Sequence, residues 1–337
     1  MRNFVLILTE CGADIGFGHL TRCLSIADAF RSAGIDAEVW VAAEASLAQS
    51  FPETVRLVDW YGLPEDLMAE AAGAYGVLVD SFKIGIREME RIAAVNARTA
   101  VIDDAPRRQY ASGVVIDWTI NAEHFAFPTR SAGVSYFLGS GYCALRPEFR
   151  RVPERVFSDS PLSLLVTFGG SDTRSMTAPI VAMLQQEFPA LEKLVAVGPA
   201  CSNRTFRSLE NHNTVFRTAV DGDQMQRWMA RADVAICGGG QTLYELASQG
   251  LPPVITGVAE DQKEDIRGFT RAGFGIEAGC WQRPDLLDAI AAGIRELWPA
   301  YLRQRHSEAG RRCVDGHGAE RLVTAILTEW KSLVPHG

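Results

Sequence analysis

The sequence predicts two α/β domains, each built on a parallel sheet with helices on both of its faces. Short, continuous apolar runs alternate with segments of helical spacing along most of the 337 residues, and such strands are typical of parallel sheets that are buried on both faces. A charged segment with three prolines, at 147–161, interrupts the alternation and is the predicted linker. A chain of this length can form two separate cores, so we expect an N-terminal domain at 1–150 and a C-terminal domain at 151–337.

The first domain is expected to begin with a strand that leads into a glycine-rich turn and a helix. The run FVLILT predicts the strand at 4–9, and from Gly18 the apolar residues recur at helical spacing until Gly34, which is expected to end the helix. The further expected elements are helices around 64–73 and 85–96 and strands in AEVWVAA (37–43), VRLVDW (55–60), GVLVDSF (76–82), TAVIDD (99–104) and GVVIDWTIN (113–121).

The second domain shows the same order of strand, glycine loop and helix. Its expected elements are helices ending near 187, at 222–231, from 241 and toward the C-terminus, and strands in SLLVTF (163–168), LEKLVAVG (191–198), NTVFRTAV (213–220), DVAICGGG (233–240) and PPVITGV (252–258). The simplest architecture is two Rossmann-like domains that face each other across a cleft. Ligands of open α/β sheets bind beyond the carboxyl ends of the strands, and all three glycine clusters of the sequence follow strands.

The composition indicates a folded protein that acts on small molecules. Hydrophobic residues make up 47% and charged residues 22% of the chain, and the formal net charge of −8 does not provide the basic surface that nucleic acid requires. The seven cysteines form no CxxC pair, which is typical of a reducing compartment and predicts neither disulfides nor a zinc site. The apolar run near the N-terminus is too short for a signal peptide or a membrane span. We therefore expect a cytoplasmic protein without metal, cofactor, nucleic acid or membrane span.

The first two glycine clusters differ in how well they suit an anion. GADIGFGH (12–19) lacks the third glycine of a dinucleotide-binding loop and the lysine of a P-loop, and a tight turn is its structural alternative. FGGSDT (168–173) precedes a helix, and a helix N-terminus favours an anion. Capping of that helix by Ser171 or Asp172 is the alternative.

The third cluster, in ICGGGQTLYELASQGLPPV (236–254), is the most informative segment. Three consecutive glycines let the backbone approach a ligand closely but are costly in chain entropy, so we favour ligand binding here over a plain turn. Gln241 and Thr242 open the next helix. Glu245 follows one turn later, where its carboxylate could accept hydrogen bonds from ribose hydroxyls; a solvated helix residue is the alternative.

His19 is the one histidine among six at a glycine-rich helix start. A role as general base or acid is the functional interpretation, since a helix N-terminus favours the neutral imidazole. A structural role or phosphate binding is the alternative. No GxSxG, HExxH or paired cysteine and histidine motif supports a serine, zinc or thiol hydrolase. Carboxylates also follow or end strands at the same predicted edge, with turn capping as the alternative for each: Asp14, Asp80, Asp103 and Asp104.

Segments spread over about residues 1–320 carry a resemblance to a known family: IGFGHLTRCLSIADAF, VLVDSF, AVIDD, INAEHF, LGSGYCALRPEF, VTFGGSD, MARADVAICGGGQTLYELASQGLP and AEDQ. They resemble the UDP-2,4-diacetamido-2,4,6-trideoxy-β-L-altropyranose hydrolases of pseudaminic acid biosynthesis, the PseG family. The combination of GxGHxxR with YxxLRxEF and GGSD is much more specific than any one of these motifs. The family is related to the GT-B glycosyltransferases, including the GlcNAc transferase of peptidoglycan synthesis, so the resemblance implies a GT-B-like fold.

The resemblance also implies roles for individual residues. His19 matches the proposed catalytic base, which activates water for attack at the anomeric carbon and releases UDP without a metal. Tyr142 and Arg146 match a motif that shapes the sugar site, and Asp261 and Gln262 match a pair that faces the sugar.

Two sets of contacts are therefore expected. The residues expected at the sugar are Asp14, Gly18, Asp80, Asp103, Tyr142, Arg146, Asp261 and Gln262. The residues expected at the nucleotide are Gly169, Gly170, Ser171, Asp172, Gly239, Gly240, Gln241, Thr242 and Glu245, of which the last matches a ribose-binding glutamate.

Two departures from the family pattern concern the sugar. Ser81 and Phe82 stand where many members have histidine and tyrosine, and Asp261 stands where asparagine is usual. The leading hypothesis is a hydrolase that releases UDP from a UDP-2,4-diacetamido-2,4,6-trideoxyhexose, in the synthesis of nonulosonic acids for uses such as flagellin glycosylation. Other enzymes of the sugar pathway are its expected partners. The alternatives are a GT-B glycosyltransferase with a similar donor and a non-catalytic nucleotide-sugar-binding protein.

Overall fold

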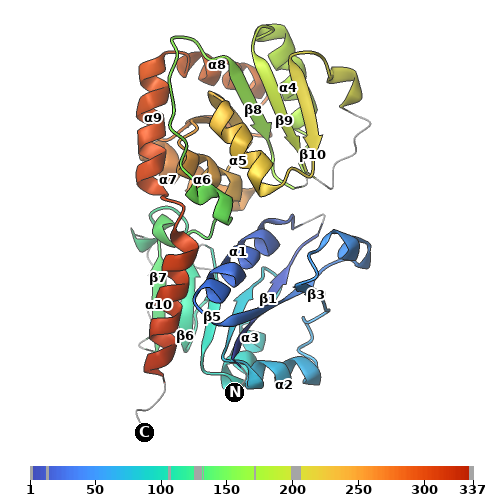
Figure 1. Ribbon diagram of the computed structural model, residues 1–337, viewed down its shortest axis with the longest axis vertical. Helices are drawn as coiled ribbons and strands as arrows, with labels where there is room; N and C mark the ends of the chain where they lie inside the picture. The colour runs from blue at the N-terminus through green and yellow to red at the C-terminus, as the bar shows by residue number, and fades with distance from the viewer. Residues whose placement is uncertain are drawn as a thin grey trace. The chain divides into compact units, whose positions relative to one another are not determined.

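The computed structural model describes residues 3–12, 15–104, 108–124, 131, 133–170, 172–198 and 206–333. The chain forms two compact units, unit 1 with Met1–Arg146 and His317–Gly337, and unit 2 with Pro147–Gly316. Each unit is an α/β structure around one sheet, as predicted (Figure 1).

Unit 1 contains a seven-stranded sheet in which all neighbouring strands run parallel, in the order β3-β2-β1-β4-β5-β6-β7. Its strands are β1 (Phe4–Glu10), β2 (Asp36–Ala42), β3 (Val55–Leu57), β4 (Gly76–Asp80), β5 (Thr99–Ile102), β6 (Gly113–Asp117) and β7 (Val134–Leu138). Its α-helices are α1 (Gly18–Ser32), α2 (Glu65–Gly73), α3 (Ile86–Val95) and α10 (Gly318–Ser332), and its 3₁₀ turns are η1 (Ala45–Ser50), η2 (Ala122–His124) and η3 (Ser140–Tyr142).

Helices cover both faces of this sheet, which explains why its central strands are continuously apolar up to their polar carboxyl ends. Successive side chains of a strand point to opposite faces. On β1, Phe4, Leu6 and Leu8 join a core with α2 and α3. Val5 and Ile7 are fully buried on the opposite face, with α1 packed beside the strand.

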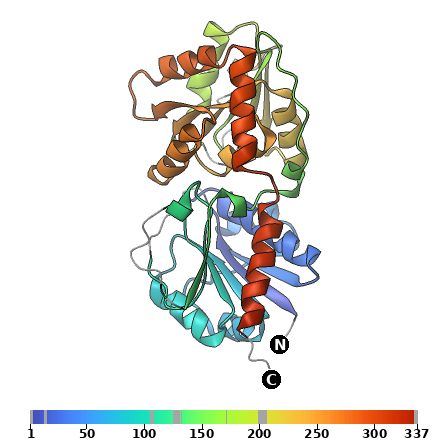
Figure 2. The same ribbon diagram turned by 90° about the vertical axis from the view of Figure 1, so that its left-hand side faces the viewer.

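The C-terminal helix belongs to a different unit from the one that the expected domain boundary gave it. We expected 317–337 in the second domain, but α10 packs against α1 within unit 1 (Figure 2). Its Trp330 is fully buried and stacks on Phe30 of α1, with ring centroids 6.1 Å apart. The same indole covers Gly76 at the start of β4, where a side chain would collide with it. An apolar helix face is visible in a sequence, but the sheet that it covers is not.

Unit 2 contains a six-stranded parallel sheet in the order β10-β9-β8-β11-β12-β13. Its strands are β8 (Ser163–Thr167), β9 (Glu192–Val197), β10 (Thr214–Thr218), β11 (Val234–Gly238), β12 (Pro253–Gly257) and β13 (Ile276–Cys280). Its α-helices are α4 (Thr177–Glu187), α5 (Gly222–Arg231), α6 (Gln241–Gln249), α7 (Lys263–Arg271), α8 (Leu286–Glu296) and α9 (Ala300–Cys313), and its 3₁₀ turns include η4 (Pro147–Arg150), η6 (Arg207–Leu209) and η7 (Glu260–Gln262). The sequence did not predict the edge strands β7 and β13.

The predicted linker at 147–161 is an ordered part of unit 2. Its Arg155 donates hydrogen bonds to the main-chain carbonyls of Met229, Ala232 and Gln249, at the ends of α5 and α6. Carbonyls at helix C-termini lack intrahelical donors, so the arginine satisfies them and attaches the segment to the unit.

None of the helices in the described part of the chain is both long enough and apolar enough to cross a membrane.

Candidate active site

The first glycine cluster forms a turn that brings the start of α1 to the carboxyl end of β1. Gly12 and Gly16 exchange two main-chain hydrogen bonds, and Gly16 has a φ of 81°, which favours glycine. Phe17 precedes α1 without a side-chain cap, and a side chain on Gly18 would meet no atom of the described residues. The described residues of the turn therefore leave the position of a Gly18 side chain open.

His19, the second residue of α1, pairs with a carboxylate from the neighbouring strand. Asp80 ends β4, which lies beside β1 with Asp80 in register with Thr9. The Nδ1 atom of His19 lies 2.7 Å from Oδ1 of Asp80. The imidazole is nearly buried, with 5% of the residue exposed, and the carboxylate is fully buried.

Arg22, one turn further along α1, keeps this carboxylate charged. Its Nε and Nη2 atoms donate hydrogen bonds of 2.6 Å to the two oxygens of Asp80. The Cys23 thiol approaches Oδ2 of the same carboxylate at 3.5 Å. Burial alone would raise the pKa of the Asp80 carboxyl, but the Arg22 guanidinium and then His19 outweigh it and hold the pKa well below its usual range. Asp80 is therefore an anion that can only accept hydrogen bonds.

This pairing determines which nitrogen of His19 carries the proton. Since ionised Asp80 can only accept, Nδ1 is the protonated nitrogen of the neutral ring, and Nε2 keeps its lone pair. Arg22 Nη2 also lies 3.1 Å from Nδ1, because both donors approach the same oxygen. In the described part of the chain no hydrogen bond involves Nε2. A histidine held in this way can accept a proton at Nε2.

A second carboxylate completes the charge balance around Arg22. Its Nη1 donates to Oδ2 of Asp104 over 2.6 Å, and the guanidinium lies 5.0 Å from the centroid of the Trp118 ring. Burial would lower the pKa of Arg22, but Asp104 and Asp80 raise it well above its usual value. We call His19, Asp80, Arg22 and Asp104 the His19 network. Sequence reasoning placed its histidine and its carboxylates at this edge but missed Arg22, for which the GxGHxxR spacing was the available signal.

Phe82 forms an apolar wall beside the imidazole. Its ring meets that of His19 edge to face, with centroids 4.6 Å apart, and 38% of the residue is exposed. Fully buried Glu10 fixes this segment by accepting hydrogen bonds from the Ser81 hydroxyl, the Phe82 amide and the Tyr61 hydroxyl. Ser81 and Phe82, two of the three positions that depart from the pattern of the family that the sequence resembles, are thus held in place.

The other residues expected at the sugar in unit 1 have different surroundings. Asp103 accepts hydrogen bonds from Arg108 and from the Tyr110 hydroxyl, at 2.9 and 3.1 Å, so it braces its own loop. Tyr142 stacks on Phe137 with centroids 5.5 Å apart. Asp14 lies outside the described residues, as does Ser171 in unit 2.

In unit 2 the loop after β8 uses its carboxylate as a helix cap. Asp172 accepts hydrogen bonds from the amides of Met176 and Thr177, over 2.8 and 3.0 Å, at the start of α4. An anion therefore already occupies the amides that a phosphate would use there. This is the capping alternative for Asp172. Gly169 in the same loop has a φ of 74°, and a Cβ there would meet no atom of the described residues.

The loop between β11 and α6 is fixed by a glutamine from the next loop of the sheet. The side-chain oxygen of Gln262 accepts hydrogen bonds from the amides of Gly239 and Val258, both at 3.1 Å. A side chain on Gly239 would collide with Ile266, so packing as well as ligand access requires that glycine. Gly240, which has no side chain, precedes α6, and the first turn of α6 contains no acidic residue.

Three more expected residues lie in the helical segments that follow these loops. Glu245 is buried in α6, with 4% of the residue exposed, and its exposure therefore does not match the solvated alternative. Asp261 is exposed in η7. Thr242 lies in the first turn of α6.

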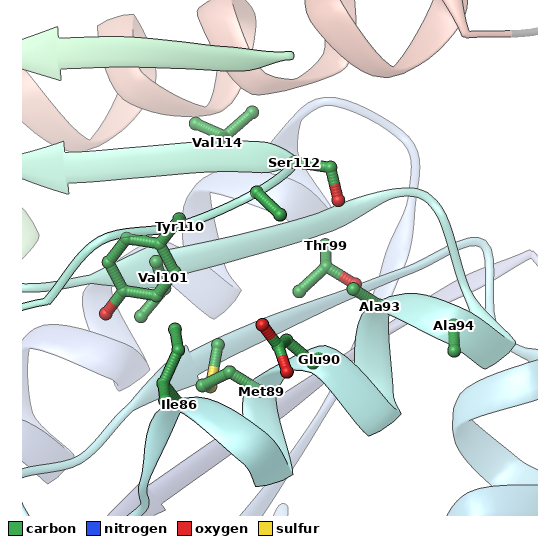
Figure 3. Close-up of a pocket in the computed structure, with 11 residues that line it drawn as sticks. Ile86, Met89, Glu90, Ala93, Ala94, Thr99, Val101, Tyr110, Ser112 and Val114 are labelled. Atoms are coloured by element: carbon green, nitrogen blue, oxygen red, sulfur yellow. The ribbon is translucent and has the colours of Figure 1, made fainter. Parts of the chain in front are cut away.

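A separate cavity of about 300 Å³ lies on one face of the unit 1 sheet (Figure 3). Ile86 and Met89 of α3 line it together with Val101 and Tyr110. None of its lining residues belongs to the His19 network. Among the described residues, no group of three or more histidine, cysteine or carboxylate side chains is arranged to hold a metal ion.

The two sheets, with the His19 network at the carboxyl edge of one of them, define the class of protein: the chain has the fold of the GT-B glycosyltransferases. Three solved structures share it. MnaA of Staphylococcus aureus with UDP has a TM-score of 0.64 at 11% identity, over 99% of this chain and 98% of that one. MurG of Acinetobacter baumannii has a TM-score of 0.60 at 13% identity, over 96% of this chain and 99% of that one. The spinosyn rhamnosyltransferase SpnG with thymidine diphosphate has a TM-score of 0.56 at 15% identity, over 99% of this chain and 100% of that one. At these identities the likeness shows the fold.

Two curated proteins are distant relatives in sequence. The spore coat polysaccharide biosynthesis protein SpsG of Bacillus subtilis is 27% identical over 197 residues, which are 57% of this chain and 57% of that protein. The pseudaminic acid cytidylyltransferase and UDP-2,4-diacetamido-2,4,6-trideoxy-beta-L-altropyranose hydrolase of Helicobacter pylori is 22% identical over 276 residues, 80% of this chain and 47% of that protein. The chain thus spans about half the length of the curated relatives it matches. No family model matches the chain.

Proposed function

We propose that the protein is a nucleotide-sugar hydrolase that releases UDP from a UDP-2,4-diacetamido-2,4,6-trideoxyhexose, with His19 as the general base. The observation that carries this proposal is the His19–Asp80 pair: Nδ1 is held by the carboxylate, and among the described residues Nε2 has no hydrogen-bond partner and can accept a proton. The name of the Helicobacter pylori relative, which aligns with 80% of this chain, includes this hydrolase activity and supports the choice of substrate.

In this mechanism His19 removes a proton from water as the water oxygen attacks the anomeric carbon. The bond between that carbon and the β-phosphate oxygen breaks, its electron pair stays with the phosphate, and UDP leaves. Nε2 then carries the extra proton, and the imidazolium is stabilised by ionised Asp80, 2.7 Å from Nδ1. Arg22 ensures that Asp80 is charged before the reaction begins. The site residues Tyr142, Arg146 and Asp261 are proposed to contact the sugar, and Glu245 the ribose.

Transfer of the sugar to an acceptor other than water is the second candidate. The exposed ring of Phe82 beside His19 favours it, because an apolar wall at this point can receive part of an acceptor as well as the sugar. The structural neighbour SpnG, by its name a rhamnosyltransferase, is an enzyme of this second class.

A panel of nucleotide sugars, incubated without acceptor in ¹⁸O-labelled water, separates the two. Hydrolysis predicts UDP release and one labelled oxygen in the free sugar, whereas a transferase leaves the donor intact until an acceptor is added. His19→Ala should lower kcat by about 10²- to 10⁴-fold and leave UDP binding unchanged. His212→Ala, at an exposed histidine of unit 2, is the matched control. Near wild-type turnover by His19→Ala would overturn the proposed mechanism.

A further inference from the structure

The carboxyl edge of the unit 2 sheet holds an arginine that has no carboxylate partner among the described residues. Arg174, in the loop between β8 and α4, is exposed and lies with its guanidinium carbon 4.2 Å from the centroid of the Trp281 ring. Its Nε donates to the carbonyl of Val258 over 3.2 Å. In the part of the chain that the structure describes, its two terminal nitrogens make no hydrogen bond or ion pair.

The contacts of Arg174 restrict its position without consuming its charge. Stacking on an aromatic face and one hydrogen bond at Nε fix the plane of a guanidinium. The loop itself is held by Asp172, which caps α4 and also accepts a hydrogen bond at its carbonyl from Ser175. Four of the five N–H groups of the guanidinium therefore remain available, in the planar fork that suits a phosphate.

A chain of contacts connects this arginine to the glycine loop before α6. Val258, whose carbonyl accepts from Arg174, donates its amide to the Gln262 side chain. The same glutamine oxygen accepts from Gly239. Trp281 is joined to the end of β12 by its amide, which donates to the carbonyl of Gly257 over 2.9 Å. The loops that follow β8, β11, β12 and β13 thus form one connected group.

The orientation of Gln262 adds a second donor. Because two backbone amides point at one atom of its side chain, that atom is the oxygen, and Nε2 must face the other way. Nε2 lies 3.7 Å from the position of a Cβ on Gly240, the residue that precedes α6. A guanidinium, an amide NH₂ and a helix N-terminus without an acidic first turn all favour an anion.

We propose that Arg174, held by Trp281, binds the diphosphate of the nucleotide together with Gln262 Nε2 and the start of α6. The inference rests on the proposed function for the identity of the ligand, and it assigns the positive charge that the glycine loops lack. It also changes the role of Gln262 from a sugar contact to a diphosphate contact. Trp281 acts as a positioning residue for Arg174.

Calorimetric titration of the full chain with UDP, UMP, uridine and inorganic pyrophosphate tests this assignment. Arg174→Gln should weaken UDP binding by about 10- to 100-fold, abolish measurable pyrophosphate binding and leave uridine binding unchanged. Arg174→Lys keeps the charge but not the planar fork of donors, so its affinity for UDP should lie between those of the wild type and Arg174→Gln. Arg267→Gln is the matched control, because Arg267 is exposed on α7 and pairs with Glu264.

Trp281→Leu should weaken UDP binding less than Arg174→Gln does, and Trp281→Phe should retain most of the affinity, since a phenyl ring still offers a face to the guanidinium. A purely structural role of the tryptophan would instead weaken uridine and UDP binding equally.

The outcomes separate this inference from the proposed function. UDP binding that depends on Arg174, without hydrolysis of any donor, would retain the diphosphate site and reject the hydrolase. Normal hydrolysis by Arg174→Gln, with KM for the donor and Kd for UDP as in the wild type, would reject the diphosphate site alone. A wild-type chain that binds neither UDP nor pyrophosphate would also overturn it.

Discussion

Replacing Asp80 with asparagine tests how the His19 network controls the histidine. The variant keeps the shape of the side chain but removes the charge that Arg22 and His19 share. An amide NH₂ can face Nδ1 as a donor, which would move the ring proton to Nε2 and block proton uptake there. The same replacement at a buried aspartate that orients a catalytic histidine in serine proteases lowers kcat by about 10⁴-fold, and we expect a loss of about 10³- to 10⁴-fold.

The same substitution has a cost in stability that can be estimated from the network. Removing one partner of a buried ion pair costs about 3–5 kcal/mol because the remaining charge stays buried. Arg22 would keep its 2.6 Å contact with Asp104, so we expect the lower end, about 3 kcal/mol. Urea-induced unfolding measures this cost, and acceptor-free UDP release measures kcat under conditions in which the variant is folded. Asp28→Asn, at an exposed carboxylate of α1, is the control and should change the unfolding free energy by less than about 0.5 kcal/mol.

The pH dependence of stability gives an independent measurement. The pKa of Asp80 in the folded protein lies well below its ordinary value of about 3.9. Its contribution to stability is therefore present in full above about pH 4, and it is lost as the pH falls through the lower folded-state pKa. Asp80→Asn should flatten the fall in unfolding free energy below pH 4. A folded variant that keeps kcat within threefold of the wild type would refute the proposed role of Asp80.

Two further substitutions test the packing inside each unit, one in unit 1 and one in unit 2. Trp330→Ala should lower the unfolding free energy by about 3–5 kcal/mol, because the indole is fully buried over Gly76; a loss below 1 kcal/mol in a urea titration would contradict the place of α10 in the unit 1 core. Gly239→Ala should cost about 1–3 kcal/mol and weaken UDP binding in calorimetry, because its Cβ would lie 2.5 Å from Ile266 Cγ1. Gly240→Ala is its control for stability, because among the described residues its Cβ would meet just the Gln262 side chain, at 3.7 Å; equal destabilisation by both variants would contradict the packing argument.

The central strands were predictable from the sequence because a parallel sheet covered on both faces requires apolar residues at every position. The expected strand at 4–9 corresponds to β1, and the expected helix between Gly18 and Gly34 corresponds to α1. The edge strands were less predictable. All five residues of β7 are only partly buried, and β13 contains Gly279 in an irregular register beside β12. Strands of this kind lack a continuous apolar run.

The site was predictable only in part, because its parts are far apart in the sequence. A histidine after a glycine turn and an aspartate at the end of a strand are local signals. Apart from its place in the GxGHxxR motif, Arg22 has the character of an ordinary polar helix residue, and its partner Asp80 is 58 residues away. The pairing exists because β4 lies directly beside β1, and that strand order cannot be read from a periodic pattern. For the same reason the contact of Arg174 with Trp281 has no local signal.

The return of α10 to unit 1 affects how the protein is made and how it can be engineered. Residues on both sides of unit 2 belong to unit 1, so unit 2 is an insertion within it. During synthesis the core of unit 1 cannot be completed until the whole insertion has left the ribosome, since α10 and its Trp330 follow unit 2 in the chain. The two junctions are neighbours, because Gly318 packs against the backbone of Cys143 and Gly316 against that of Phe149. A chimera that exchanges the inserted unit therefore needs two adjacent splice points, and one made at a single point would separate α10 from the sheet it covers.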